Sequence, residues 1–262
     1  MIIIPRRKWH YPLADERFYQ KELTSLVNQM HSAVISNKDR INSYIKTYRL
    51  DDDESIVQLE LIFDSIDREY RQRIAQEFIE SKVKQMFDGV NRFNEQEFRA
   101  TMKNGLKLDV FQSEPWLNQM SELWNKDNVT LIKSVEAKYF ENIESIVSNA
   151  VRDGTLLTDV TEDIQQATGV SQRRAQLIAR DQVGKLNGQL TRQRQTGVGI
   201  DEYVWSTSKD DSVRKAHQAR EGEKFSWNNP PSDGHPGMPI SCRCVALPVI
   251  DTDKIKIIGV RR

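Results

Sequence analysis

The stretch SQRRAQLIARDQVGKLNGQLTRQRQTGVG, residues 171–199, lies where the sequence pattern of this 262-residue chain changes from helical to mixed α+β. Ser171 is a suitable helix N-cap, and apolar residues follow it at the spacing of a helix that buries one face. The expected inward face consists of Ala175, Ile178, Val183, Leu186 and Leu190. Gly197 and Gly199 then end the pattern. The sequence therefore predicts a helix over 171–196 and a different architecture after it.

The chain before this stretch has a helical pattern. From about Asp15 to Gln195, glycine and proline are sparse and apolar residues recur every three or four positions. Gly154 is expected to stop one of the helices, and Gly169 is expected to break the chain before Ser171. The predicted helices lie at 15–36, 54–88, 131–150 and 159–167.

The chain after this stretch has the mixed pattern of a small α+β unit. Its predicted elements are a strand at 202–206, a short helix at 211–220, a loop rich in proline and glycine at 222–240 and a strand at 244–250. We therefore expect a mainly α fold, with a long-helix N-terminal domain followed by a small α+β C-terminal module. The expected divisions are an arm and helix at 1–50, an extended helical domain at 51–199 and the module at 200–262.

The charge balance limits the classes of partner. Lysine plus arginine and aspartate plus glutamate each number 38, so contact with nucleic acid or anionic lipid has to be local. No apolar run approaches the roughly 18 residues of a membrane helix, and the initial MIII is too short for a signal-peptide core. The sequence predicts a protein made and kept in a cytosol, without membrane contact. A disulfide is disfavoured in that compartment.

One predicted helix, at 171–196, carries a marked excess of basic residues on its outer positions, opposed there by the single acid Asp181. Two interpretations are open: a solvated face, or a contact with nucleic acid or an acidic protein. The candidate nucleic-acid-binding residues are Arg173, Arg174, Arg180, Lys185, Arg192 and Arg194. Candidates in the C-terminal tail are Lys254, Lys256, Arg261 and Arg262.

Both cysteines of the chain lie in the segment GHPGMPISCRC, residues 234–244. In an extended C-x-C, Cys242 and Cys244 present their sulfurs to one side, which suits a shared metal better than a strained disulfide. His217 and His235 complete a possible Cys₂His₂ set for a structural zinc ion. The alternative is that the cysteines pack as small hydrophobic residues while His217 makes a local hydrogen bond. The spacing does not fit a zinc deaminase, and no third residue marks a Cys–His nucleophile.

Several motifs occur in a defined order over residues 165–250. They are AQLIARDQ at 175–182, YVWSTSKDDSVRKAH at 203–217, Gly222, HPG at 235–237 and CRC at 242–244. Together they closely resemble the phage Mu F-like head morphogenesis family, which comprises minor capsid proteins of tailed phages. The family motif maps onto Trp205, Asp210, Asp211, Arg214, His217, Gly222, His235, Pro236, Gly237, Cys242, Arg243 and Cys244.

The resemblance implies a role in the phage head. Such a protein is made in the host cytoplasm and is present in few copies in the virion, inside the capsid near the portal. Its expected partner is the portal protein, with major capsid or scaffolding protein and packaged DNA as further candidates, and its role is head assembly or handling of packaged DNA. No catalytic residue carries over, so we expect no enzyme. The alternative is a metal-dependent hydrolase or nuclease that uses the His/Cys cluster, and the number of metal ligands distinguishes the two.

Two local features allow simple structural explanations. Asp210 suits the N-cap and Asp211 the first turn of the short helix, and Arg214 is expected to pair with either of them. At the N-terminus, Trp9 and Tyr11 stand among basic residues and prolines. Either this segment is disordered or its aromatic side chains anchor it in a groove of a ring-shaped partner.

Overall fold

The computed structural model describes residues 1–48, 53–74, 76–107, 109–110, 113–256 and 260–261. The chain forms two compact units. Unit 1 comprises Met1–Phe18, Lys84–Asn125 and Ala179–Arg262, and unit 2 comprises Tyr19–Val83 and Lys126–Ile178. Both units draw on separate segments of the chain, whereas the divisions suggested by the sequence are consecutive.

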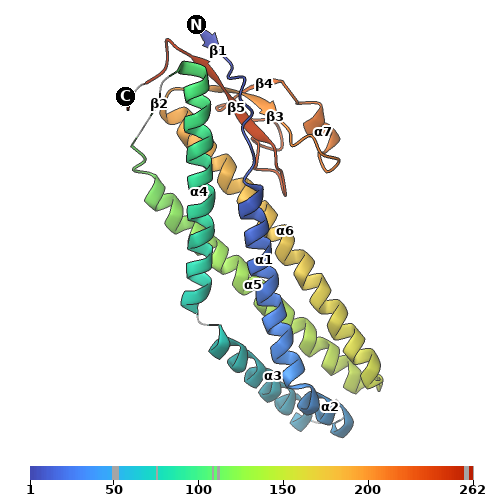
Figure 1. Cartoon of the computed structure of the whole chain (residues 1–262). Helices are drawn as coiled ribbons and strands as arrows, with labels where there is room; N and C mark the ends of the chain where they lie inside the picture. Colours follow the sequence, from blue (N-terminus) through green and yellow to red (C-terminus); the bar gives the residue numbers. More distant parts are fainter. Residues whose placement is uncertain (49–52, 75, 108, 111–112, 257–259, 262) are drawn as a thin grey trace. The chain divides into compact units, whose positions relative to one another are not determined.

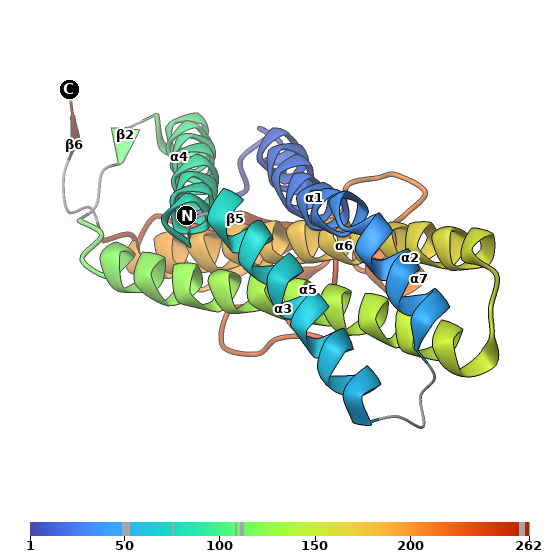
Figure 2. The same cartoon turned by 90° about the horizontal axis from the view of Figure 1, so that it is seen from below.

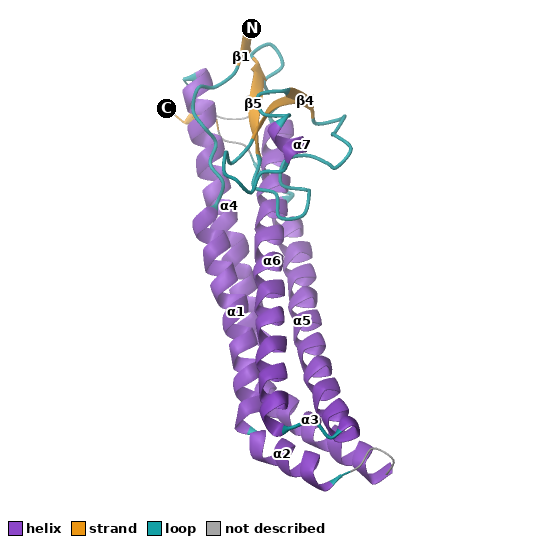
Figure 3. Ribbon diagram, turned by 90° about the vertical axis from the view of Figure 1, so that its right-hand side faces the viewer, coloured by secondary structure: helices purple, strands orange, loops and turns teal. Residues whose placement is uncertain are grey.

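The fold is mainly α, as predicted, with a small antiparallel sheet built largely from the C-terminal part of the chain (Figure 1). The helices are α1 (Leu13–Ser36), α2 (Lys38–Thr47), α3 (Asp53–Arg73), α4 (Gln76–Leu106), α5 (Leu117–Asp153), α6 (Leu157–Gly197) and α7 (Lys215–Gln218). The strands are β1 (Ile2–Ile3), β2 (Asp109–Val110), β3 (Glu202–Ser206), β4 (Lys224–Ser226), β5 (Val245–Asp251) and β6 (Val260–Arg261). All of these strands belong to unit 1, and Figure 3 shows β1, β4 and β5 in orange.

Several helix predictions are wrong in their boundaries, and the helix predicted at 131–150 begins earlier, at Leu117 of α5. The helix predicted at 54–88 is two helices, because α3 ends at Arg73 and α4 begins at Gln76. Gly169 does not break the chain, because α6 continues through it for 41 residues in all. Thr168 and Ser171 on either side of this glycine are buried, so packing outweighs its low helix propensity. The end of α5 just before Gly154 and the end of α6 at Gly197 agree with the sequence.

Unit 2 is a helical unit in which polar side chains cross-link the buried faces. The segments of α5 and α6 in this unit run side by side (Figures 1 and 2). The Tyr139 hydroxyl lies 3.2 Å from Oγ1 of Thr168, which lies 3.1 Å from Nδ1 of His31. Tyr70 donates a 2.6 Å hydrogen bond to Glu136. These bonds satisfy polar groups that are costly to bury alone.

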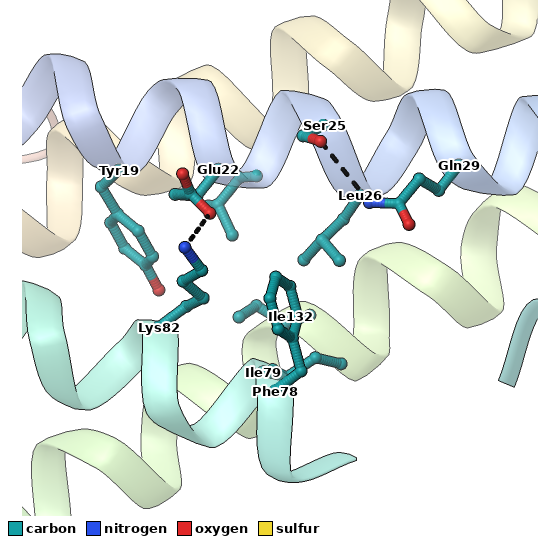
Figure 4. A pocket seen from close by; sticks show the side chains of 10 residues that line it. Tyr19, Glu22, Ser25, Leu26, Gln29, Phe78, Ile79, Lys82 and Ile132 are labelled. Carbon is teal, nitrogen blue, oxygen red and sulfur yellow. Dashed lines mark hydrogen bonds and ion pairs between the residues drawn. The ribbon is translucent and has the colours of Figure 1, made fainter. Parts of the chain in front are cut away.

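A small pocket in unit 2 lies between α1, α4 and α5 (Figure 4). Lys82 forms an ion pair with Glu22 at 3.1 Å, and its ammonium lies 5.2 Å from the ring centre of Phe78. The pocket volume is about 20 Å³. That space holds a water molecule and no larger ligand.

The four-stranded sheet of unit 1 has the order β1-β5-β3-β4, and every neighbouring pair is antiparallel. The predicted strand at 202–206 coincides with β3, and the strand predicted at 244–250 begins one residue later, as β5. The segment predicted as a loop at 222–240 contains β4. A separate backbone pairing joins β2 to β6.

The N-terminal segment is part of unit 1, which corrects the prediction for its aromatic residues. Ile2 pairs with Asp251, and Trp9 is only 4% exposed. The core around Trp9 consists of Phe98, Met102, Val198, Ile200, Val245 and Ile250. Trp9 is therefore not available as an anchor for a partner, because it is buried in the core of unit 1.

Candidate metal-binding site

Three of the four predicted metal ligands come together in unit 1. Nδ1 of His217 lies 3.6 Å from Sγ of Cys242 and 3.5 Å from Sγ of Cys244. The three donor atoms all lie within 4.8 Å of one another. His217 comes from α7, and the cysteines come from the segment that leads into β5. The two sulfurs of the C-x-C therefore face one side, as predicted.

His235 lies outside this group, which corrects the predicted set of four. Its Nδ1 is 2.9 Å from the Tyr203 hydroxyl, and its ring packs 4.8 Å from that of Trp227. Burial, followed by the charge of Arg192, lowers the pKa of His235. This histidine is thus a buried core residue that contacts Tyr203 of β3.

The His217 ring is held from two further directions. Its Nε2 lies 3.0 Å from Oδ2 of Asp233, whose Oδ1 accepts a 2.6 Å hydrogen bond from Arg220. Partial burial tends to raise the pKa of Asp233, but the hydrogen bonds from Arg220 and His217 hold it below its usual value. Trp205 of β3 packs edge-on against the imidazole at 5.2 Å. A proton on Nε2 satisfies Asp233 and leaves the Nδ1 lone pair directed at the thiols.

The pKa values of the two thiols are shifted in opposite directions. A hydrogen bond from Cys244, against the opposing effect of burial, lowers the pKa of Cys242 to about 6. The same interaction and burial raise the pKa of Cys244. The Cys244 amide also lies 3.4 Å from Sγ of Cys242. One thiolate is therefore stabilised inside this cluster.

Other motif residues shape the loops around the cluster. Asp210 accepts a 2.9 Å hydrogen bond from the Ser212 amide, so it caps a turn, whereas α7 begins only at Lys215. Arg214 donates to the Ile240 carbonyl at 2.5 Å, in place of the predicted pairing with an aspartate. Gly222 has a φ of 81°, a conformation that favours glycine, and its amide bonds the Trp205 carbonyl at 2.9 Å. Asp211 is exposed.

The segment from Pro236 to Arg243 packs closely against other parts of unit 1. At the closest points, backbone carbonyls of Pro236 and Cys242 lie over Gly188 and Gly184 of α6. Arg243 points away from the thiols, as predicted, and forms a two-pronged ion pair with the fully buried Glu16. The cysteine segment is therefore fixed to α6 and to α1.

A family model described as Phage Mu protein F like protein matches residues 141–247, which extend from the second half of α5 into β5. The chain carries a phage Mu F-like region. All the residues discussed above, except Glu16, belong to this Mu F-like region.

A similar curated protein is an uncharacterized protein of Haemophilus influenzae, 35% identical over 165 residues. The match covers 62% of this chain and 37% of that protein, so the chain spans well under half of its relative. No solved structure gave a significant match. Among the described residues, no helix is both long and apolar enough to span a membrane.

The predicted basic face of the Mu F-like region contains exposed residues and residues that bind other side chains of the protein. Arg173, Arg174 and Arg192 are exposed. Lys185 pairs with Asp181 at 2.6 Å, and Arg180 donates to Ser212 at 3.2 Å. Arg194 is fully buried, so its assignment to a nucleic-acid-binding face is wrong. In the tail, Lys254 and Lys256 are exposed, whereas the side chain of Arg261 and the whole of Arg262 lie outside the described residues.

Sequence reasoning missed four residues that contact the cysteine segment or the His217 ring. Asp233 was not singled out because a single acid in a loop has no distinguishing pattern. Glu16 lies 227 positions from its partner Arg243. Gly184 and Gly188 did carry a signal, because two glycines four residues apart inside a helix share one face and allow close approach.

Proposed function

We propose that this protein is a minor component of a tailed-phage head that attaches to the portal protein inside the procapsid. It would assist head assembly or the handling of packaged DNA, with major capsid or scaffolding protein as further partners and the virion interior near the portal as its location. The observation that supports this proposal most directly is the Mu F-like match over residues 141–247. The predominantly helical fold and the exposed arginines of α6 agree with it.

Within this proposal the helices contact the portal, and the sheet of unit 1 forms a rigid module. Unit 2 carries exposed apolar side chains on α3, with Val57 at 52% and Leu61 at 50% exposure. These positions are four residues apart and therefore lie on one helix face. A test of the proposal can alter this face without disturbing a buried contact.

Replacing Val57 and Leu61 together with glutamate is expected to abolish co-purification with the portal protein, because it places charge on the proposed contact face. The measurement is co-expression of the tagged chain with the portal protein of the same phage, followed by affinity capture. The matched control is the pair Met238→Ser and Ile240→Ser, which alters exposed apolar residues of unit 1. Loss of capture in the control pair alone would reverse the assignment of the units, and no capture of the wild type would refute portal attachment.

Contact with DNA is expected to come from the exposed arginines. Binding of the wild type to duplex DNA is expected to weaken steeply with salt, and replacing Arg173 and Arg174 with alanine should reduce the slope of log affinity against log salt by about 1.8. This value follows from about 0.9 for each phosphate that an arginine no longer neutralises. Fluorescence anisotropy over a series of salt concentrations measures it, with Arg68→Ala, an exposed arginine of α3, as the control. Salt-insensitive binding would contradict the prediction.

The alternative function, a metal-dependent hydrolase or nuclease, gains support from one observation. A metal bound by three protein ligands instead of four would keep one coordination position open, as catalytic zinc sites do. Against it, the three donor residues are only 2–4% exposed, which leaves a polymer little access. Cleavage of duplex DNA that requires zinc and is lost in Cys244→Ser would favour the alternative.

A further inference from the structure

We propose that His217, Cys242 and Cys244 bind one zinc ion, and that Asp233 is the positioning residue that orients the histidine ligand. This inference does not depend on the role in phage head assembly. It rests on the spacing of the three donor atoms, on the hydrogen bonds around them and on the chain segments that they join.

The donor spacing matches that of a tetrahedral zinc ion. Zinc binds thiolate sulfur at about 2.3 Å and imidazole nitrogen at about 2.05 Å. At a tetrahedral angle, a sulfur and a nitrogen on the same ion are then about 3.6 Å apart. The two measured separations from Nδ1 of His217 are 3.6 Å to Cys242 and 3.5 Å to Cys244. Both nitrogen–sulfur separations therefore fit a shared tetrahedral ion, and all three donor atoms lie within 4.8 Å of one another.

The donor set selects zinc by its chemistry. Two sulfur ligands and one imidazole are soft and borderline donors, which favour zinc over magnesium or calcium. Both sulfurs face Nδ1 of His217, and the Cys244 amide lies 3.4 Å from Sγ of Cys242. An apolar pair of cysteines would need neither this arrangement nor a histidine nitrogen directed at both sulfurs.

The surroundings of His217 match the outer shell of zinc sites. A histidine ligand almost always donates its second ring N–H to a carboxylate or carbonyl group, which fixes the tautomer and the ring plane. Here Nε2 of His217 meets Asp233 at 3.0 Å, and Arg220 holds that carboxylate at 2.6 Å while packing 5.0 Å from the ring centre of Trp205. A chain of contacts thus leads from β3 through Arg220 and Asp233 to the ligand.

The ion would join elements that are too short to be stable alone. Helix α7 has only four residues, and the cysteines precede β5 in a segment without regular structure. An isolated helical turn is unfavourable, because nucleation costs more than one turn recovers. A zinc ion would tie α7 to the start of β5, next to the core of Tyr203, Trp205 and Trp227. The fourth position is left for water or another small ligand.

The test is the metal content and metal affinity of the purified full chain. Elemental analysis of the wild type is expected to give one zinc per chain, and Cys242→Ser, Cys244→Ser and His217→Asn are each expected to lose it. Asp233→Asn should still take up one zinc when saturated, with an affinity about 10–100-fold lower. His235→Gln is the matched control, because it replaces a buried histidine of the same unit outside the donor group and should keep the zinc.

A second measurement guards against variants that fail to fold. Titration of the metal-free wild type with cobalt(II) should give a thiolate-to-metal charge-transfer band and the intense visible bands of tetrahedral coordination. Wild-type chain that holds no zinc after titration, or that gives no thiolate band with cobalt, would overturn the proposal. So would zinc binding that survives in Cys244→Ser but is lost in His235→Gln.

Discussion

Replacing Arg194 with alanine is expected to lower the free energy of unfolding by about 3–5 kcal/mol, since it removes one partner of a buried ion pair. Arg194 is 0% exposed, and its guanidinium donates to Glu114 at 2.6 and 2.9 Å. It also donates to Oδ1 of Asn94 at 2.7 Å and to Oδ1 of Asn91 at 2.6 Å. Without the arginine, these acceptors have no donor at a site that water reaches poorly.

Urea denaturation of the wild type and of Arg194→Ala measures this difference. The matched control is Arg192→Ala, an exposed arginine two residues earlier on α6, which should change stability by no more than about 0.5 kcal/mol. Arg194→Lys is expected to recover little, because an ammonium cannot form the two parallel bonds to Glu114. Equal stability of the two alanine variants would show that the buried network contributes nothing measurable.

The burial of Arg194 was predictable from the sequence, whereas its partners were not. Arg194 lies four residues after Leu190, on the predicted inward face of α6, so helical spacing placed it inside even though its charge suggested the outside. The partners of this arginine come from α4 and from the segment before α5, 80 to 103 positions away. No local pattern predicts such a pairing.

The long helices follow from apolar spacing, because a face buried over many turns leaves a repeated signal. Their ends were harder to predict. The break between α3 and α4 carries neither glycine nor proline, and Gly169 carries a break signal that the packing of α6 overrides. Periodicity describes one helix at a time, whereas the chain reversals depend on contacts between helices.

The candidate metal site was predictable in part. The C-x-C spacing predicted both sulfurs on one side, and the structure has them so although the segment lies before β5 and not in a strand. The choice between His217 and His235 was not predictable, because both lie in short or irregular segments whose direction depends on the fold. His235 is held instead by Tyr203 of β3, a contact between residues 32 positions apart.

Replacing either Gly184 or Gly188 with alanine is expected to destabilise the protein by about 1–3 kcal/mol, despite the higher helix propensity of alanine. A Cβ atom at Gly184 would lie 2.6 Å from the Cys242 carbonyl oxygen, and one at Gly188 would lie 2.5 Å from that of Pro236. Both neighbours are backbone atoms, so neither clash can be relieved by turning a side chain. The cysteine segment would have to move away from α6.

Thermal and urea unfolding of the two variants test this close packing, and Gly169→Ala is the matched control on the same helix. At Gly169 an added Cβ meets only Nη1 of Arg173, at 3.6 Å, so alanine should stabilise the protein by about 0.5–1 kcal/mol. Stabilisation by alanine at all three positions would contradict the close approach of the loop. Because the Cys242 carbonyl is the atom displaced in Gly184→Ala, the zinc affinity proposed above should also be lower in this variant than in Gly169→Ala, which would link the small residues of α6 to the geometry of the thiols.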